Sequence, residues 1–325
     1  MKEKYRQLLG AFFMGVLLPQ LLLSLPLHSR LPTQKPNTPT GRPSLEVSAP
    51  ENLPWQIPVL QPDGTVTQMV LEEYLVGVVL GEMPAEFETE ALKAQAVVAR
   101  TYALKRQEEG TRHPEGAVCV DPGCCQAYTS EQTYLLRGGS AASVEKIRAA
   151  VGQTAGQVLT YEGMLIEATY FSCSGGRTED AAAVWGTDVP YLQAVDSPGE
   201  EHAGRYQGQL HFSGEEFARR LDLQLQGAPE SWLGMVTYTE GSGVATMTIG
   251  GMAFSGVRLR KLLGLNSTMF YMEPGADGIT VYMQGYGHRV GMSQYGADAM
   301  AVTGSDYTQI LAYYYRGTEL TNWCG

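Results

Sequence analysis

One glutamate has the surroundings expected of a catalytic acid. Glu82 follows the apolar run of residues 76–80 and precedes Met83 and Pro84, so we expect its carboxyl to be partly removed from water. Burial disfavours the charged form and raises the pKa of a carboxyl, as protonation of a glycosidic oxygen requires. Glu86 and its acidic neighbours look solvated and should stay ionised. The alternative is that Glu82 is a surface residue at a helix end or a cap for the next helix.

A second carboxyl that could work with Glu82 is not evident in the sequence. Ordinary hydrolytic glycosidases use two carboxyl groups. Glu82 therefore belongs either to an incomplete site or to chemistry in which the sugar supplies its own nucleophile.

Arg100 and Tyr102 lie on the helix predicted after Glu82. Arg100, between two alanines, could direct its guanidinium into the corner that Glu82 occupies and bind a sugar hydroxyl or a carboxylate bidentately. Tyr102 combines an apolar ring with a polar tip, which suits a sugar-binding cleft. The competing interpretation of Arg100 is an ion pair with one of the helix glutamates.

His113, Cys119 and Cys125 are spaced six and six residues apart in a loop rich in proline and glycine. Such a loop can wrap around an ion, and Cys and His ligands suit zinc. Cys124 beside Cys125 leaves the choice of ligand open. Disulfide chemistry is the alternative, because an exported chain can oxidise its thiols, although five cysteines would leave one unpaired.

A polar turn follows a predicted strand at residues 172–178. Ser172, Ser174 and Gly175 offer hydroxyls and backbone N–H groups there, so we expect the turn to cradle a ligand. Cys173 in the same turn could instead be a nucleophile with His288 or His202 as its base, but nothing in the spacing favours this.

A glycine-punctuated run at residues 285–297 leads into another predicted helix. Its N-terminus could present Ser293 or Gln294 to a substrate. Close packing of the backbone is the alternative explanation for these glycines.

The elements that must position these residues point to the α+β class. Apolar spacing predicts a helix from residue 71 that Pro84 ends, and a second one over residues 88–109, which puts Glu82 in the corner between them. A strand pair is expected over residues 55–68 and a β hairpin over residues 156–171. We therefore predict a helical catalytic corner packed on antiparallel β hairpins.

The N-terminal part has a different composition. Residues 8–27 carry no charge and are long enough to span a bilayer, and the lysines and arginine before them predict a cytoplasmic N-terminus. A cleaved signal peptide is the alternative. We expect a cytoplasmic N-terminus and transmembrane helix over residues 1–30, a proline-rich linker over 31–53 and a folded extracytoplasmic part over 54–325, with a subdomain at about 200–275.

The charge balance limits the partners. The net charge of −11 and the lack of a basic stripe argue against binding to nucleic acid or anionic lipid, which needs clustered cations.

Five segments together resemble the stage II sporulation protein D (SpoIID) family, whose members include amidase enhancers. They are residues 71–84, 94–103, 125–128, 172–176 and 285–297. The resemblance implies a single-pass membrane protein of the sporulation septum that acts as a lytic transglycosylase during engulfment of the forespore. It implies peptidoglycan glycan strands as substrate and a wall amidase or endopeptidase and a membrane scaffold as partners. A non-catalytic amidase enhancer or wall-binding module is the alternative.

The resemblance also assigns roles to single residues. It implies that Glu82 first protonates the MurNAc–GlcNAc oxygen and then, as a base, helps the muramic 6-hydroxyl to close a 1,6-anhydro ring. It maps the zinc ligands of a subset of the family onto His113, Cys119 and Cys125. Arg289 stands where the family usually has glycine, which puts a close backbone approach there in doubt, and Cys173 replaces a Thr or Ser.

Overall fold

The computed structural model of the chain describes residues 55–323. The predicted anchor over residues 1–30 and the linker over 31–53 lie outside the described residues. Among those described, no helix has both the length and the apolar character needed to cross a membrane.

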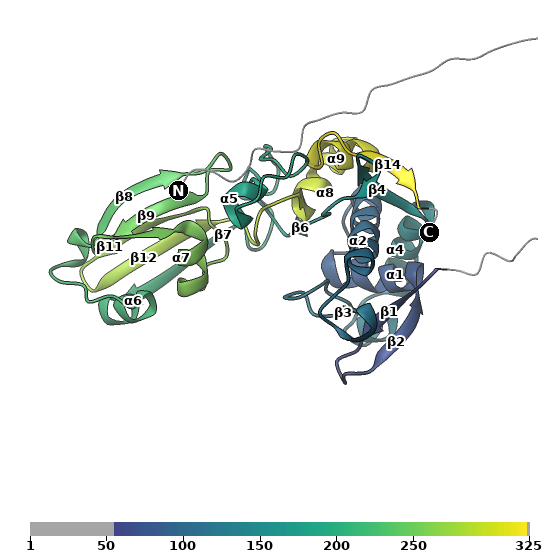
Figure 1. Cartoon of the computed structure of the whole chain (residues 1–325), viewed down its shortest axis with the longest axis horizontal. Helices are drawn as coiled ribbons and strands as arrows, with labels where there is room; N and C mark the ends of the chain where they lie inside the picture. The colour runs from purple at the N-terminus through teal and green to yellow at the C-terminus, as the bar shows by residue number, and fades with distance from the viewer. Residues whose placement is uncertain (1–54, 324–325) are drawn as a thin grey trace, which may run out of the picture. The chain divides into compact units, whose positions relative to one another are not determined.

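Three helices form the centre of the first core: α1 (Leu71–Glu82), α2 (Thr89–Glu109) and α4 (Ala141–Gln153) contact one another (Figure 1). Buried residues occur on every turn of α1 and through most of α2, as expected for helices enclosed on several sides. α8 (Gln294–Val302) and α9 (Tyr307–Tyr314) also pack on α2. The two predicted helices on either side of Glu82 are thus confirmed to within a residue or two.

Short strands and helices border this core. β1 and β2 form the predicted antiparallel pair around the turn at residues 62–64, and β3 joins β1 in parallel. β4 pairs antiparallel with both β5 and β14. These elements are β1 (Gln56–Leu60), β2 (Val66–Val70), β3 (Val118–Cys119), α3 (Glu131–Leu136), β4 (Gln157–Tyr161), β5 (Met164–Leu165), α5 (Ala181–Trp185) and β14 (Glu319–Asn322).

The predicted hairpin over residues 156–171 is shorter than expected. Of the second predicted strand, only the two residues of β5 pair with β4, and the chain then leaves the sheet. Its continuation, β6 (Tyr170–Phe171), pairs in parallel with β13 (Met292–Ser293), which directly precedes α8. The end of the expected strand therefore joins two segments more than a hundred residues apart.

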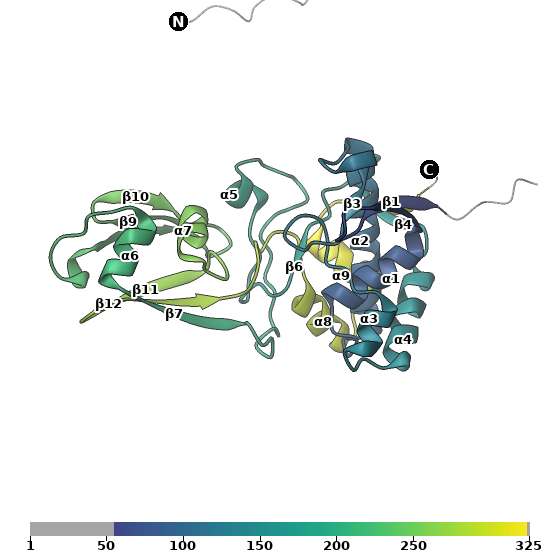
Figure 2. The ribbon, with the colours of Figure 1, turned by 90° about the horizontal axis from the view of Figure 1, so that it is seen from below.

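A second core lies between residues 212 and 283. Two antiparallel three-stranded sheets, in the orders β11-β12-β7 and β10-β9-β8, enclose the helices α6 and α7 between them (Figure 2). The elements are β7 (Gln207–Ser213), α6 (Gly214–Leu221), β8 (Leu233–Tyr238), β9 (Val244–Ile249), β10 (Met252–Ser255), α7 (Gly256–Leu263), β11 (Phe270–Gly275) and β12 (Gly278–Gln284). β7, which was not predicted from the sequence, pairs along its whole length with β12.

Arg100 holds the first core together and does not face Glu82, contrary to our expectation. Its side chain is fully buried and forms a bidentate ion pair with Glu72, at 2.9 Å and 2.5 Å. It also donates to the carbonyl of Gln157, at 3.1 Å, at the start of β4. The alternative interpretation, an ion pair with a helix glutamate, is therefore the correct one. The guanidinium also donates to carbonyls at the ends of two elements, those of Val151 in the last turn of α4 and Gln157 at the start of β4.

We expect Glu72→Gln to lower the free energy of unfolding by about 2 kcal/mol, because it leaves a buried guanidinium without its counter-charge. Glu73→Gln is the matched control. Glu73, the next residue in the sequence, pairs with Arg148 on an exposed surface, where such an ion pair contributes less than about 1 kcal/mol. Urea denaturation of both variants measures the difference. Equal losses would contradict the structural role given to Arg100.

Candidate functional site

The end of α1 sets the position of Glu82. Met83 is extended, with φ −126° and ψ 145°, because a residue before proline is excluded from helical conformation. α1 therefore ends at Glu82, and its carboxyl projects from the last turn.

Two glycines on one face of α1 let another segment lie against the helix. A Cβ on Gly81 would stand 2.9 Å from the backbone nitrogen of Tyr128, and one on Gly77 would overlap the ring of Tyr128. Thr129 donates its N–H to the carbonyl of Gly77, at 2.9 Å. The close approach brings the N–H of Ala127 to within 2.6 Å of Glu82 Oε1.

The pairing of β6 with β13 brings two further donors to Glu82. Tyr170 lies opposite Met292 in this pairing, and its hydroxyl is 3.1 Å from Glu82 Oε1. Gln294 begins α8, and its amide donates to Glu82 Oε2 at 3.4 Å. Glycines make the approach of the two strands possible, since a Cβ on Gly287 would stand 2.8 Å from the Cβ of Phe171.

Opposing effects act on the Glu82 carboxyl. Burial raises its pKa, and the hydrogen bonds from Ala127, Tyr170 and Gln294 lower it by a smaller amount, so the pKa stays above the ordinary value. The site thus favours the neutral acid and still holds donors ready for the anion. This is the combination that an acid which later becomes a base requires.

Tyr170 links the protonation of Glu82 to a neighbouring amide. Its hydroxyl lies 3.1 Å from Glu82 Oε1 and 3.0 Å from Gln126 Oε1, but it has one proton to donate. When Glu82 is ionised, Tyr170 donates to the carboxylate. When Glu82 is protonated, Tyr170 can accept from it and donate to Gln126. Burial and the adjacent carboxylate raise the pKa of Tyr170 well above its ordinary value, so the phenol stays protonated in both states.

Glu82 opens into a cleft of about 1030 Å³. Its lining mixes aromatic and polar side chains, as in many ligand sites. The other carboxyl among the described lining residues is that of Glu167, which is ion-paired with Arg106. Aromatic and polar side chains that line the cleft include those of Tyr102, Tyr170, Phe171, Ser172, Trp185, Arg205, Tyr286, His288 and Gln294.

His288 is a neutral side chain in this cleft. It packs against the rings of Phe171 and Trp185. Burial and the nearby charge of Arg260 lower its pKa to about 4, so it adds no positive charge at neutral pH. It offers a polar edge on an aromatic wall.

The structure brings only some of the expected binding residues to the cleft. Tyr102, Ser172 and Gln294 line it. Ser174 and Gly175 are instead turned onto the buried carboxylate of Glu200, which accepts from the Ser174 hydroxyl at 2.8 Å and from both backbone N–H groups. The turn cradles a carboxylate, as expected of its N–H groups, but the carboxylate belongs to the protein.

Ser293 has a structural part in the same region. It is fully buried, and its hydroxyl accepts from the N–H of Gly296 as the N-cap of α8. Its neighbour Gln294 alone reaches Glu82.

Cys173 lacks the setting of a nucleophile. It is fully buried, and burial raises the pKa of its thiol to about 11, which keeps it in the unreactive thiol form. Its backbone bonds to that of Tyr286, and the hydrogen bonds of His288 and His202 go to other groups.

The expected metal ligands come together, with one addition. His113, Cys119, Cys124 and Cys125 place their ligand atoms within 4.8 Å of one another. The four described cysteines are free thiols, so the disulfide alternative finds no pair among the described residues. Arg112 donates to the sulfur of Cys124 at 3.0 Å and lowers the pKa of that thiol to about 7. A set of one imidazole and three thiols is chemically suited to a tetrahedral metal ion, and the cluster could hold one.

Tyr170, Gln126 and the N–H of Ala127 were not predicted as neighbours of Glu82. A backbone N–H has no signature in the sequence, and Tyr170 was assigned to a hairpin strand. The sequence signal that could have indicated the approach of residues 126–129 was the spacing of Gly77 and Gly81, one helical turn apart.

Comparison with known proteins shows the family of the chain. Residues 63–161 match the family described as SpoIID: Stage II sporulation protein. The chain is 40% identical over 274 residues to stage II sporulation protein D of Bacillus subtilis (strain 168), which covers 82% of this chain and 79% of that protein. It is 31% identical over 308 residues to the amidase enhancer of the same organism, covering 77% of this chain and 40% of that protein. The Glu82 cleft, and the separate His/Cys cluster beside it, therefore belong to a member of the stage II sporulation protein D family.

Proposed function

We propose that this protein is a lytic transglycosylase that cuts the MurNAc–GlcNAc bond of peptidoglycan and leaves 1,6-anhydro-MurNAc ends. The observation that supports this most directly is a single desolvated carboxyl, Glu82, with donors to both of its oxygens. The other carboxyl in the cleft, that of Glu167, is bound to Arg106 and therefore poorly suited to activate a water. One free carboxyl fits a reaction in which the sugar provides the nucleophile.

The geometry suggests how each step is assisted. Protonated Glu82 donates its proton to the glycosidic oxygen as the bond to C1 breaks, and the GlcNAc leaves as an alcohol. The carboxylate formed is stabilised by the N–H of Ala127 and by Tyr170 and Gln294. It then takes the proton of the muramic 6-hydroxyl while that oxygen bonds to C1. Glu82 ends protonated, ready for the next turnover.

The proposed setting is the wall between mother cell and forespore. The relatives named stage II sporulation protein D support a role in sporulation, and the amidase enhancer supports action on or near the wall. The proposal also includes a membrane anchor in residues 1–30, which would hold the enzyme outside the cytoplasm. Its proposed partners are a wall amidase or endopeptidase and a membrane scaffold.

The second candidate function is a non-catalytic amidase enhancer, which the 31% identical relative of that name favours. The two functions differ in whether Glu82 is needed for glycan cleavage.

We expect Glu82→Gln to reduce release of glycan from purified wall by at least about 10²-fold, because the amide cannot donate a proton to the leaving oxygen. Glu86→Gln, an exposed glutamate of the same loop, is the matched control and should retain full activity. Mass spectrometry of the products should find anhydro-muramic ends. Reducing ends would indicate hydrolysis, and undiminished release by the Glu82 variant would favour the enhancer.

The pH dependence tests the hydrogen bond from Tyr170. The rate requires protonated Glu82, so kcat/KM should fall as the pH rises through the raised pKa of this carboxyl. Tyr170→Phe removes a bond that favours the carboxylate, so the pKa should rise and the alkaline limb should move to higher pH. Tyr102→Phe, in the same cleft without a bond to Glu82, should leave the limb in place. A shift of the Tyr170 variant to lower pH would refute this role.

We further propose that the His/Cys cluster holds one zinc ion with a structural role. Cys125 lies two residues before Ala127, whose N–H bonds to Glu82. An ion at the cluster would tie residues 113–125 together and so restrain the segment that carries this donor. His113, Cys119 and Cys125 would be ligands, with Cys124 as the fourth.

Metal analysis of the purified protein should find about one zinc per chain. His113→Ala and Cys119→Ser should lose it, and Cys124→Ser should weaken its retention in a chelator. Cys173→Ser is the control, since this thiol is buried away from the cluster, and should keep the full metal content. A metal-free wild-type protein, or equal loss in the Cys173 variant, would argue against the site.

A further inference from the structure

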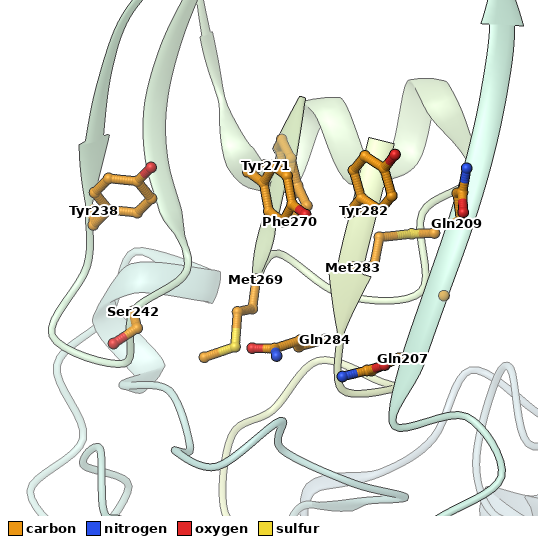
Figure 3. A pocket seen from close by; sticks show the side chains of 11 residues that line it. Gln207, Gln209, Tyr238, Ser242, Met269, Phe270, Tyr271, Tyr282, Met283 and Gln284 are labelled. Atoms are coloured by element: carbon orange, nitrogen blue, oxygen red, sulfur yellow. The ribbon is translucent and has the colours of Figure 1, made fainter. Parts of the chain in front are cut away.

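A second groove of about 880 Å³ lies on the sheet β11-β12-β7. Tyr271 and Tyr282 are register partners on neighbouring strands, and their rings stack at 4.9 Å and 14°. In Figure 3 the ring of Tyr238 stands across the groove from them, with Met269 and the amides of Gln284 and Gln207 lying below. Three tyrosines, side by side, thus line one groove.

The fold does not need these rings. The core of this part of the chain is filled by their neighbours on the same strands, Phe270, Val281 and Met283, of which Phe270 and Met283 also border the groove. Tyr271 is 54% exposed and Tyr238 is 58% exposed. Neighbouring exposed aromatic rings in a concave surface indicate a binding site more often than a structural requirement.

The lining selects an uncharged ligand. None of its eleven lining residues is charged, and Glu273, which bonds to Tyr282 of the lining, is acidic, so a negatively charged group finds no counter-ion in the groove. The polar groups are the amides of Gln207 and Gln284 and the hydroxyls of Ser242 and the tyrosines, which both donate and accept. A pyranose sugar presents apolar C–H faces to aromatic rings and hydroxyl and acetamide groups to amides. N-acetylglucosamine units combine both features without a charge.

The groove and the Glu82 cleft are lined by closely spaced residues of the same two chain segments. Gln207 at one end of β7 follows the cleft residue Arg205 by two positions, and Gln284 at the end of β12 precedes the cleft residue Tyr286 by two. Two residues of strand span about 7 Å. Gly285 donates to the carbonyl of Tyr206 at 2.8 Å, which keeps the two strands together over this step.

Buried charges fix the other wall of the groove. Tyr238 and Ser242 flank the turn between β8 and β9, and the turn residue Gly241 donates its N–H to Glu179 at 3.1 Å. Arg289, buried and with φ 68°, donates to the carbonyls of Gly241 and Ser174. The backbone at Arg289 thus adopts the left-handed conformation typical of glycine, and its side chain ties the groove to the turn behind the cleft.

We propose that this groove binds uncharged N-acetylglucosamine-containing units of the same glycan strand that is cut at Glu82. The proposal rests on the proposed function for its substrate class. Sugars in the groove would anchor a long strand without touching the bond that breaks, so the groove would raise affinity for polymers more than for short substrates.

The test is calorimetric binding of β-1,4-linked N-acetylglucosamine hexamer and dimer to the full-length chain carrying Glu82→Gln. We expect Tyr238→Ala combined with Tyr271→Ala to weaken hexamer binding about tenfold. Each contact between a sugar and a ring should contribute a binding free energy similar to that of an aromatic pair. The loss should be smaller for the dimer, because a dimer can occupy the groove or the Glu82 cleft but is too short to gain from both. Met235→Ala is the control, because Met235 is 78% exposed on the same strand as Tyr238 and lies outside the groove. Matching circular dichroism melting curves exclude a folding defect.

Unchanged hexamer affinity in the double variant would overturn the proposal and leave the groove to a protein or peptide. With Glu82 intact, the double variant should raise KM for long denuded strands and leave kcat unaltered. Failure of the proposed function would give a different result, because the Glu82→Gln variant would still cut glycan. The binding measurement involves no turnover, so its outcome would be the same in either case.

Discussion

The close approach of residues 126–129 to α1 is the constraint on which the catalytic corner depends. Gly77 and Gly81 leave the helix surface without side chains, so a second backbone can lie against it. The approach delivers a backbone N–H to Glu82 and places Gln126 where Tyr170 can reach it. A side chain on either glycine would displace the segment, and the carboxyl would lose its shortest hydrogen bond. Two glycines within a helix lower its stability, and the close backbone approach explains why they are present here.

The electrostatics of the corner follow from incomplete burial. A carboxyl enclosed by apolar groups alone would stay protonated and could not act as a base, whereas one in water would be ionised and could not act as an acid. Glu82 lies between these limits because it is half-buried and three donors partly offset the cost of its charge. Tyr170 adapts to either state by turning its single proton.

The sequence predicted the helices well and the site in part. Both helices around Glu82 have dense apolar patterns, and their ends carry proline or glycine, which act locally. β7 was not predicted because it begins with Gln-Gly-Gln, which has no strand pattern of its own, and the strand depends on pairing with β12. Arg100 was misplaced because its position depends on Glu72 and on carbonyls of β4 and α4, whose location relative to α2 no local pattern encodes. The spacing of His113, Cys119 and Cys125 predicted the His/Cys cluster. The sequence left the part of Cys124 open, and the structure places its sulfur with the other three ligand atoms.

The parallel pairing of β6 with β13 has a consequence for when the enzyme becomes active. Glu82 lies 88 residues from Tyr170 and 212 residues from Gln294 in the chain, so both hydrogen bonds need distant segments to come together. Such long-range contacts form late in folding, because their loops must close first. A chain that is still being synthesised, or one that lacks the residues from β13 onward, contains Glu82 without Gln294 and without the strand that pairs with Tyr170. The proposed active site is therefore complete only when the whole domain has folded.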